Sequence, residues 1–348
     1  MKSVISILFS TTVLISASVL AHHGAVTSGF LYNADELVEI QGEVTEVLWR
    51  NPHLRARMRV TNVEGDETMW ELELGPTPRE FENMGILPED LLGNVRAAGH
   101  VSKRNPHSLG VIYFLLPNGQ EHVQGRNREP RWSNIQLTDV TPEIDQAKVE
   151  AARQTAEGIF RVWGRRLGGP LDRVINAQSL TEQGLELAAA FDPLADNAQL
   201  DCRHGMPDTM FDPVPMEISK EGDHIRLHIA QYNIQRVIHM EDDELHDEPQ
   251  GSPVGYSVGR WDDDVLVVTT THVDWPYYLN SGTPQSDQVN YTERFAVSND
   301  GQTLDYSITI SDPVVFPKSF SIERTREWVP GVEIEPFDCV AEWSDSTG

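Results

Sequence analysis

The sequence predicts a mainly β protein made of two barrels, an OB-like five-stranded barrel followed by a larger antiparallel, lipocalin-like barrel. Short runs in which apolar and polar residues alternate recur through both halves of the chain, with hairpin-type turns between them. In the first half these runs follow the order of three strands, a helix and two strands, which is the order of an OB-fold. A stretch of helical composition separates the halves, and a length of 348 residues suits two domains. A β-sandwich is the alternative for the second domain.

Residues 1–21 have the three parts of a secretory signal peptide. Lys2 gives the positive start, Val4–Ile15 the apolar segment, and Val19–Ala21 a small-residue cleavage site. We therefore expect an exported protein, with a bacterial periplasm as the best fit, whose mature chain begins at His22. The apolar segment is too short to span a membrane, and no later segment approaches the roughly 20 apolar residues of a spanning helix, so no membrane insertion is expected.

The first barrel is assigned to residues 22–140. The predicted strands are Val38–Val47, Leu54–Val60, Met69–Leu74, Val95–Ser102 and Leu109–Leu116. Pro78–Met84, between the third and fourth strands, is predicted to be a short helix capped by Thr77. In an OB-fold, ligands bind beside the loop that joins strands one and two and the loop that joins strands four and five.

Residues 141–200 are predicted to form a helical connector. Its first helix is predicted over Glu143–Leu167 and its second over Thr181–Phe191, with Thr181 as the cap. The first helix would bury a stripe made of Val149, Ala152, Ala156, Phe160 and Trp163. The connector is richer in apolar residues than a flexible linker, so we expect it to pack on the domain that follows.

Residues 201–348 are predicted to form the second barrel, in which short antiparallel strands follow one another through hairpin turns. Turns are expected at Glu221–Asp223 and at Asn299–Gly301. The predicted strands are Met216–Ile218, His224–Tyr232, Arg236–Met240, Tyr256–Trp261, Val265–His272, Val289–Val297, Leu304–Ser311 and Ser319–Trp328.

The chain is strongly acidic, with 54 acidic and 27 basic residues and a formal net charge of −27. Such a surface repels phosphate backbones and anionic lipids, so nucleic-acid binding is not expected, whereas cations are attracted. Solubility or adaptation to salt would account for the same charge.

Cys202 and Cys339 are predicted to form a disulfide bond, which an oxidising compartment permits. A bond that closes so long a loop would stabilise the folded chain by about 3–5 kcal/mol. Two buried, unpaired thiols are the alternative. Neither cysteine has a partner at Cys-x-x-Cys spacing, so a thiol redox motif and a four-cysteine zinc site are not expected.

The tetrapeptide Arg-Asn-Pro-His occurs twice, at Arg50–His53 and at Arg104–His107. One copy falls in each of the two loops that border the binding face of an OB-fold. They are therefore the first candidates for a functional site. Two simpler interpretations stay open, since both copies could form structural turns or could contact an anionic small molecule through arginine and histidine.

Together with the start of the mature chain, the histidines of these two loops suggest a metal site. Cleavage after Ala21 would give His22 a free α-amine, which can chelate a metal together with its own ring nitrogen. His53 and His107 are the natural further ligands, and His23 could replace either of them. Because amine and imidazole nitrogens favour copper or nickel, the sequence predicts a copper ion at this site.

The second barrel has its own candidate ligand-binding residues. On a strand, His224, Arg226, His228 and Tyr232 share one face, which could line a cavity for a small molecule, although a half-solvated sheet explains the pattern more simply. His224 and His228 lie about 13 Å apart on a strand, too far to share one metal ion. Trp275, the first residue of a Trp-Pro-Tyr-Tyr segment, either gates such a pocket or covers the core.

Motifs identify no catalytic group. The sequence contains no His-Glu-x-x-His, P-loop or Rossmann glycine pattern. The favoured function is therefore binding, of a copper ion at the first barrel and of a small molecule in the second. An isomerase, lyase or hydrolase acting in the second barrel around His224, Arg226 and His228 is the competing prediction. An envelope scaffold that binds another protein is the third.

Several segments resemble known families. Through Ala21-His22-His23, Gly42-Glu43-Val44, Trp49 and Asn51-Pro52-His53, the first part resembles a family of exported bacterial proteins of unknown function. The second barrel resembles a companion uncharacterised family through Ser257–Trp261, Leu266–Val268, Glu293–Phe295 and Asp312-Pro313. Members of that second family often have histidine where this chain has Tyr256 and Gln285, so chemistry through those histidines is not expected here. The resemblance implies export, two barrels and an Asn-Pro-His loop, and it implies no reaction.

Overall fold

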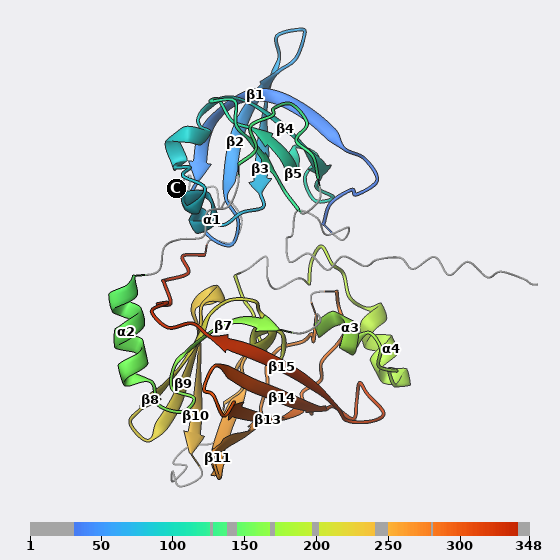
Figure 1. Cartoon of the computed structure of the whole chain (residues 1–348). Helices are drawn as coiled ribbons and strands as arrows, with labels where there is room; N and C mark the ends of the chain where they lie inside the picture. Colours follow the sequence, from blue (N-terminus) through green and yellow to red (C-terminus); the bar gives the residue numbers. More distant parts are fainter. Residues whose placement is uncertain are drawn as a thin grey trace, which may run out of the picture.

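A computed structural model of the chain describes residues 31–125, 128–137, 145–167, 171–196, 202–240, 250–279 and 281–339. The protein is mainly β and consists of two closed barrels, as the sequence predicts (Figure 1). The first barrel, drawn in blue and teal, lies at one end of the molecule, and the second, drawn mainly in yellow to red, lies at the other. The expected signal peptide, with His22 and His23, lies outside the described residues, so those expectations stay predictions.

Five strands close the first barrel in the OB order, which confirms the prediction. They are β1 (Val38–Leu48), β2 (Arg55–Thr61), β3 (Glu67–Leu74), β4 (Gly93–Val101) and β5 (Ser108–Leu115). β1 pairs with both β2 and β4, and a parallel pairing of β3 with β5 closes the ring. A short strand, β6 (Glu121–Val123), extends the sheet from β5, and the sequence pattern does not predict it.

The interior of the first barrel is apolar, because alternate residues of each strand point inward. Its fully buried side chains include Leu54, Ala56, Met58, Leu72 and Leu74. Helix α1 (Pro78–Asn83) adds Phe81 to this core, and the 3₁₀ helix η2 (Pro88–Leu91) leads into β4. Thr77 and Glu80 form a capping box at the start of α1, which confirms the predicted cap.

Nine strands close the second barrel in the order β10-β11-β12-β13-β14-β15-β7-β8-β9. Neighbouring strands are antiparallel except β10 and β11, which run parallel. The strands are β7 (Val162–Leu167), β8 (Met216–Glu221), β9 (His224–Ile229), β10 (Ile234–Met240), β11 (Tyr256–Asp262), β12 (Val265–Thr271), β13 (Asn290–Val297), β14 (Thr303–Ser311) and β15 (Phe320–Trp328). The predicted barrel is confirmed, and the β-sandwich alternative is wrong.

The predicted helix over Glu143–Leu167 is wrong beyond its first part. Helix α2 covers Gln146–Thr155, and Val162–Leu167 forms strand β7, which pairs with β15 and β8. Gly158 turns the chain between them at a φ of +48°, a conformation that glycine adopts easily. Trp163 is buried in the second barrel and not on a helix. The barrel closes through this strand, and such long-range pairing overrides local helix propensity.

The remaining helices lie around the second barrel. They are α3 (Leu171–Ile175), α4 (Glu182–Ala189) and the 3₁₀ helices η4 (Asp208–Phe211) and η5 (Gln231–Asn233). Thr181 caps α4, as the sequence predicts. Figure 1 shows α2 on one side of this barrel and α3 and α4 on the opposite side. None of the helices in the described ranges is both long enough and apolar enough to cross a membrane.

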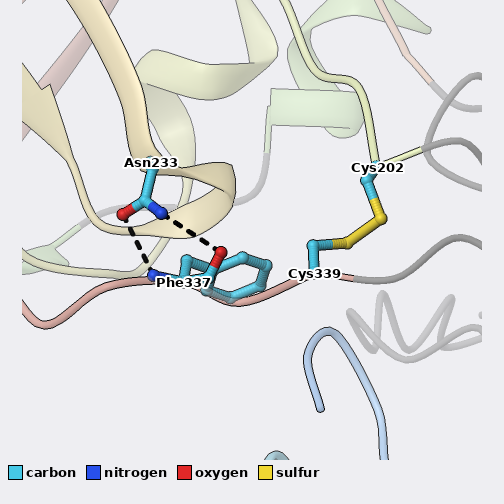
Figure 2. The surroundings of a disulfide bond; sticks show 4 residues. All are labelled: Cys202, Asn233, Phe337 and Cys339. Atoms are coloured by element: carbon cyan, nitrogen blue, oxygen red, sulfur yellow. Dashed lines mark hydrogen bonds between the residues drawn. A yellow bond between two sulfur atoms is a disulfide. The ribbon is translucent and has the colours of Figure 1, made fainter.

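Residues 333–339, named here the C-terminal strap, connect the two barrels. The bond between Cys202 and Cys339 confirms the predicted disulfide (Figure 2). Beside it, the side-chain amide of Asn233 accepts a hydrogen bond from the backbone N–H of Phe337 (3.0 Å) and donates one to its carbonyl oxygen (3.2 Å). The end of the strap also bridges to the loop between β1 and β2, so it contacts both barrels.

Candidate functional site

The first Arg-Asn-Pro-His copy receives the C-terminal strap. Arg50 forms an ion pair with Asp338 at 2.7 Å, and the backbone N–H of Asn51 donates to the carbonyl oxygen of Asp338 at 2.9 Å. The ring Nδ1 of His53 lies 2.6 Å from the carbonyl oxygen of Gly75, just beyond the end of β3. This copy is therefore a docking loop for another part of the chain.

The second Arg-Asn-Pro-His copy forms a local turn. The side chain of Asn105 accepts a hydrogen bond from the backbone N–H of His107 at 2.9 Å, and the N–H of Arg104 donates to Ser102 Oγ at 3.2 Å. Asparagine commonly bonds the backbone two residues ahead in this way. The His107 ring is exposed and meets the ring of Trp70 edge-on, with 5.4 Å between centroids.

The structure does not bring His53 and His107 together. His53 contacts the carbonyl of Gly75, whereas the His107 carbonyl accepts from the N–H of Glu71 at 2.8 Å. Glu71 and Gly75 are four positions apart, which along a strand is about 13 Å. Two imidazoles that bind one ion each lie only about 2 Å from it. In the described ranges no group of three or more His, Cys, Asp or Glu residues is placed to hold a metal. A copper site that uses both loop histidines therefore finds no support in this geometry.

The histidine face of β9 lies on the outside of the second barrel. His224, Arg226 and His228 are half-buried, and the residues between them are fully buried in the interior. These three side chains therefore do not line the lumen, where the competing enzyme prediction would need them. The simpler interpretation, an antiparallel sheet with one face towards solvent, accounts for the pattern.

Tyr232 and Trp275 lie apart from that face, and the rings of both lie near the ring of His204. β9 ends at Ile229, and Tyr232 belongs to η5, so the prediction that it continues the strand is wrong. Its ring meets His204 edge-on at 5.7 Å and the ring of Phe337 at 5.2 Å. Trp275 is buried, 6.3 Å from the His204 ring, and so covers the core and does not gate an open pocket.

His204 is a buried histidine that sequence patterns do not single out. Its ring nitrogens Nε2 and Nδ1 each lie 3.1 Å from a carboxylate oxygen, of Asp208 and Asp212 respectively. Burial alone would lower the pKa of His204, but the charges of Asp212 and then Asp208 outweigh it and raise the pKa to about 10. The imidazole is therefore charged at neutral pH and holds η4 against the end of the barrel.

A pair of histidines faces outward across two neighbouring strands. Ile225 of β9 pairs with Ile238 of β10. One position further along this antiparallel register, His224 lies opposite His239. Their ring centroids are 4.7 Å apart at an interplanar angle of 73°. On the other side of His239, the ring of Tyr256 from β11 stacks at 4.8 Å. These three side chains form what we name the three-ring cluster.

The sequence alone does not reveal this pair, because the pairing depends on strand register. His224 and His239 are far apart in sequence, and only the hairpin between β9 and β10 makes them neighbours. Directly opposed residues on an antiparallel pair have Cβ atoms about 4.5–5.5 Å apart, so two imidazoles at such positions can reach one ion. A correctly predicted hairpin turn at Gln231–Asn233 would have been the signal that reveals them.

The interior of the second barrel holds a buried ion pair. Arg236 and Glu293 have no solvent exposure and form a bidentate contact. Arg236 also donates to Ser257 Oγ at 3.0 Å and to Thr270 Oγ1 at 2.6 Å, and Tyr306 donates to Glu293 at 2.8 Å. With a further contact to a methionine sulfur, all the N–H groups of Arg236 have partners inside the protein. The pair is therefore satisfied by the barrel's own side chains.

Residues that carry the sequence resemblance build this interior. Ser257 and Glu293 belong to the network around Arg236, and Asp312 accepts hydrogen bonds from the Tyr278 hydroxyl at 3.0 Å and from Ser286 Oγ at 2.6 Å. Gln285 is also buried and donates to the carbonyl oxygen of Trp275 at 2.8 Å. A structural role in closing the barrel accounts for these positions.

Comparison with known proteins adds one match. The model of a family of unknown function, DUF6152, matches residues 11–104, which run from the N-terminal segment to the second Arg-Asn-Pro-His copy. The chain is thus similar to an uncharacterised family over its first barrel as far as β4. No curated protein and no solved structure matches the chain.

Proposed function

We propose that the protein is an exported binding protein for a divalent transition metal, with His224 and His239 as the protein ligands and copper(II) as the best-fitting ion. The observation that carries this proposal is the cross-strand placement of the two imidazoles, with 4.7 Å between their ring centroids. Imidazole suits copper, nickel and zinc, and copper(II) binds most tightly among the divalent first-row ions.

The position of the pair favours a preformed site. Both histidines lie on strands of a closed barrel, and such rigid elements hold ligands in place better than loops do. Two protein nitrogens leave the remaining coordination positions to water or to a ligand from another molecule. The formal net charge of −27 draws cations towards the surface.

Two observations support export as part of the proposal. The first is the apolar segment Val4–Ile15, which follows Lys2 and precedes a small-residue cleavage site. The second is the Cys202–Cys339 disulfide, since such bonds persist mainly in oxidising compartments.

Copper titration of the mature protein by calorimetry tests the site. His224→Ala and His239→Ala should each abolish binding of one copper equivalent, and electron paramagnetic resonance of the wild type should show two imidazole nitrogens on the metal. His228→Ala is the matched control, because His228 lies on the same face of β9 but opposite Gln235. This control should bind as the wild type does.

A second experiment distinguishes copper binding at His224 and His239 from binding at the chelate that the sequence predicts at His22. Adding one alanine before His22 removes that chelate and leaves the three-ring cluster intact. If binding survives both single variants and disappears in the extended chain, the metal belongs to the N-terminus and the proposal is wrong. Absence of binding to the wild type would also overturn it.

A further inference from the structure

A hollow lies outside the second barrel, between α2 and the barrel wall. It has a volume of about 350 Å³, within the usual range for small-molecule sites of about 300–1,000 Å³. Its sides come from α2, from β7 and β8, and from the segment 329–332 that precedes the C-terminal strap. We name it the α2 groove.

Aliphatic side chains form two facing walls of the α2 groove. Ala152 and Ala156 line it from the α2 side, and Val329 and Pro330 line it from the opposite side. Gly331 lets the two sides approach closely, since a Cβ atom at this position would lie 2.9 Å from the backbone nitrogen of Val149 in α2. The space between the walls therefore suits a narrow apolar chain.

Positively charged side chains cover the aromatic rings of the groove. The guanidinium of Arg161 lies 4.6 Å from the centre of the Trp328 ring, and the Lys220 amine lies 4.6 Å from that of Phe160. These cations are held on the rings by cation–π attraction. Lys220 also pairs with Glu157 at 2.9 Å, so Arg161 is the cation available to an anionic ligand.

Two polar atoms of the lining lack partners. Arg161 donates from Nη1 to the Gly301 carbonyl at 2.6 Å, but its Nε and the Oγ of Ser219 are buried without a hydrogen-bond partner in the part of the chain that the structure describes. Both residues line the groove, and the Arg161 carbonyl accepts from the N–H of Ile218, the residue before Ser219. Leaving a buried donor unpaired costs about 1–3 kcal/mol, and a carboxylate could satisfy both atoms.

We propose that the α2 groove binds an aliphatic carboxylate, with its carboxylate at Arg161 and Ser219 and its chain between α2 and residues 329–332. Shape and charge favour this ligand, since two facing walls are aliphatic and the cations Arg161 and Lys220 outnumber Glu217 among the charged residues of the lining. The site shares no residue with the three-ring cluster, so it is independent of the proposed metal function.

Titration with dodecanoate below its micelle concentration tests this proposal by calorimetry. Ala152→Trp fills the groove and should weaken binding at least tenfold, whereas Ala151→Trp, on the exposed side of the same helix, should bind as the wild type does. Circular dichroism of each variant checks that the fold is retained.

A second test compares ligands of opposite charge. The wild type should bind dodecanoate at least tenfold more tightly than dodecyltrimethylammonium, and Arg161→Gln should remove this preference. Equal binding of both amphiphiles, or unchanged binding by Ala152→Trp, would overturn the proposal. So would a wild type that binds no dodecanoate.

Discussion

The two barrels bury polar groups in different ways. At the edge of the first, the buried Glu121 of β6 is satisfied by the backbone N–H groups of residues 131–133. The first has an apolar core, and its buried histidine, His122, is neutral because burial lowers the pKa to about 4. The second encloses the Arg236–Glu293 ion pair, and at its end a charged histidine, His204, is buried between the carboxylates of Asp208 and Asp212. A closed barrel therefore tolerates charge inside when its own wall supplies the opposite charge and enough hydrogen-bond partners.

The number of strands explains this difference. A barrel widens as strands are added, so a ring of nine leaves space that short apolar side chains cannot fill. Arg236 on β10 and Glu293 on β13 meet across that space. Arg326 on β15 donates to the carbonyl oxygens of Met210 and Asp212, so it fixes η4 into one end of the barrel. Polar side chains thus complete the wider interior.

The largest expected effect comes from breaking the buried ion pair. Glu293→Ala leaves the Arg236 guanidinium buried and unpaired, so we expect it to lower the free energy of unfolding by about 3–5 kcal/mol. Urea unfolding measures this loss, and hydrogen exchange should assign it to β10–β13. The double variant Arg236→Met/Glu293→Met should recover much of the stability, since it removes both charges. A single-variant loss below about 1 kcal/mol would contradict the importance of the pair.

The buried histidines should make the barrels sensitive to opposite pH changes. The raised pKa of His204 means that its stabilising contribution is complete below about pH 6.5 and is lost as the pH rises through about 10. The lowered pKa of His122 means that its contribution is present above about pH 6.5 and is lost as the pH falls through about 4. Each change is limited to about 1.4 kcal/mol per pH unit.

Hydrogen exchange at several pH values distinguishes the two barrels. Alkaline solution should weaken protection around η4 and the second barrel, and His204→Gln should remove that dependence. Acid should weaken β5 and β6 first, and His122→Gln should remove that dependence. A matched loss of protection in both barrels at one pH extreme would show that these histidines do not control it.

The sequence predicts the fold well where local patterns decide it. Alternation and turns locate all five strands of the first barrel and eight of the nine in the second, because each strand carries its own inward and outward pattern. β7 is missed because its residues suit a helix equally well and only pairing with β15 and β8 makes them a strand. β6 is missed because three residues give no readable period.

The candidate site is less predictable because it depends on register and distance. The tetrapeptide repeat suggests a shared role, but one copy docks the strap and the other forms a turn. His224 is identified from the sequence, yet its partner His239 follows only from the pairing of β9 with β10. Arg236 and Glu293 lie on strands that are not neighbours, so no local pattern joins them.

The smallest expected effect concerns the two tetrapeptide copies themselves. Arg50 and Asp338 are largely exposed, so Arg50→Ala should lower the free energy of unfolding by at most about 1 kcal/mol. Arg104→Ala is the matched control and should change stability less, because the backbone N–H of Arg104 bonds within its own loop, to Ser102 Oγ, and this bond survives the substitution.

The disulfide decides how much the Arg50 contact matters. While Cys339 is bonded to Cys202, the strap stays close to the first barrel, and losing one surface ion pair frees little of the chain. In a Cys202→Ser/Cys339→Ser background that tether is absent, so Arg50→Ala should reduce hydrogen-exchange protection of the Asn51 amide more strongly than in the oxidised chain. An equal effect in both backgrounds would mean that the backbone contacts of the strap, and not the disulfide, hold it on the first barrel.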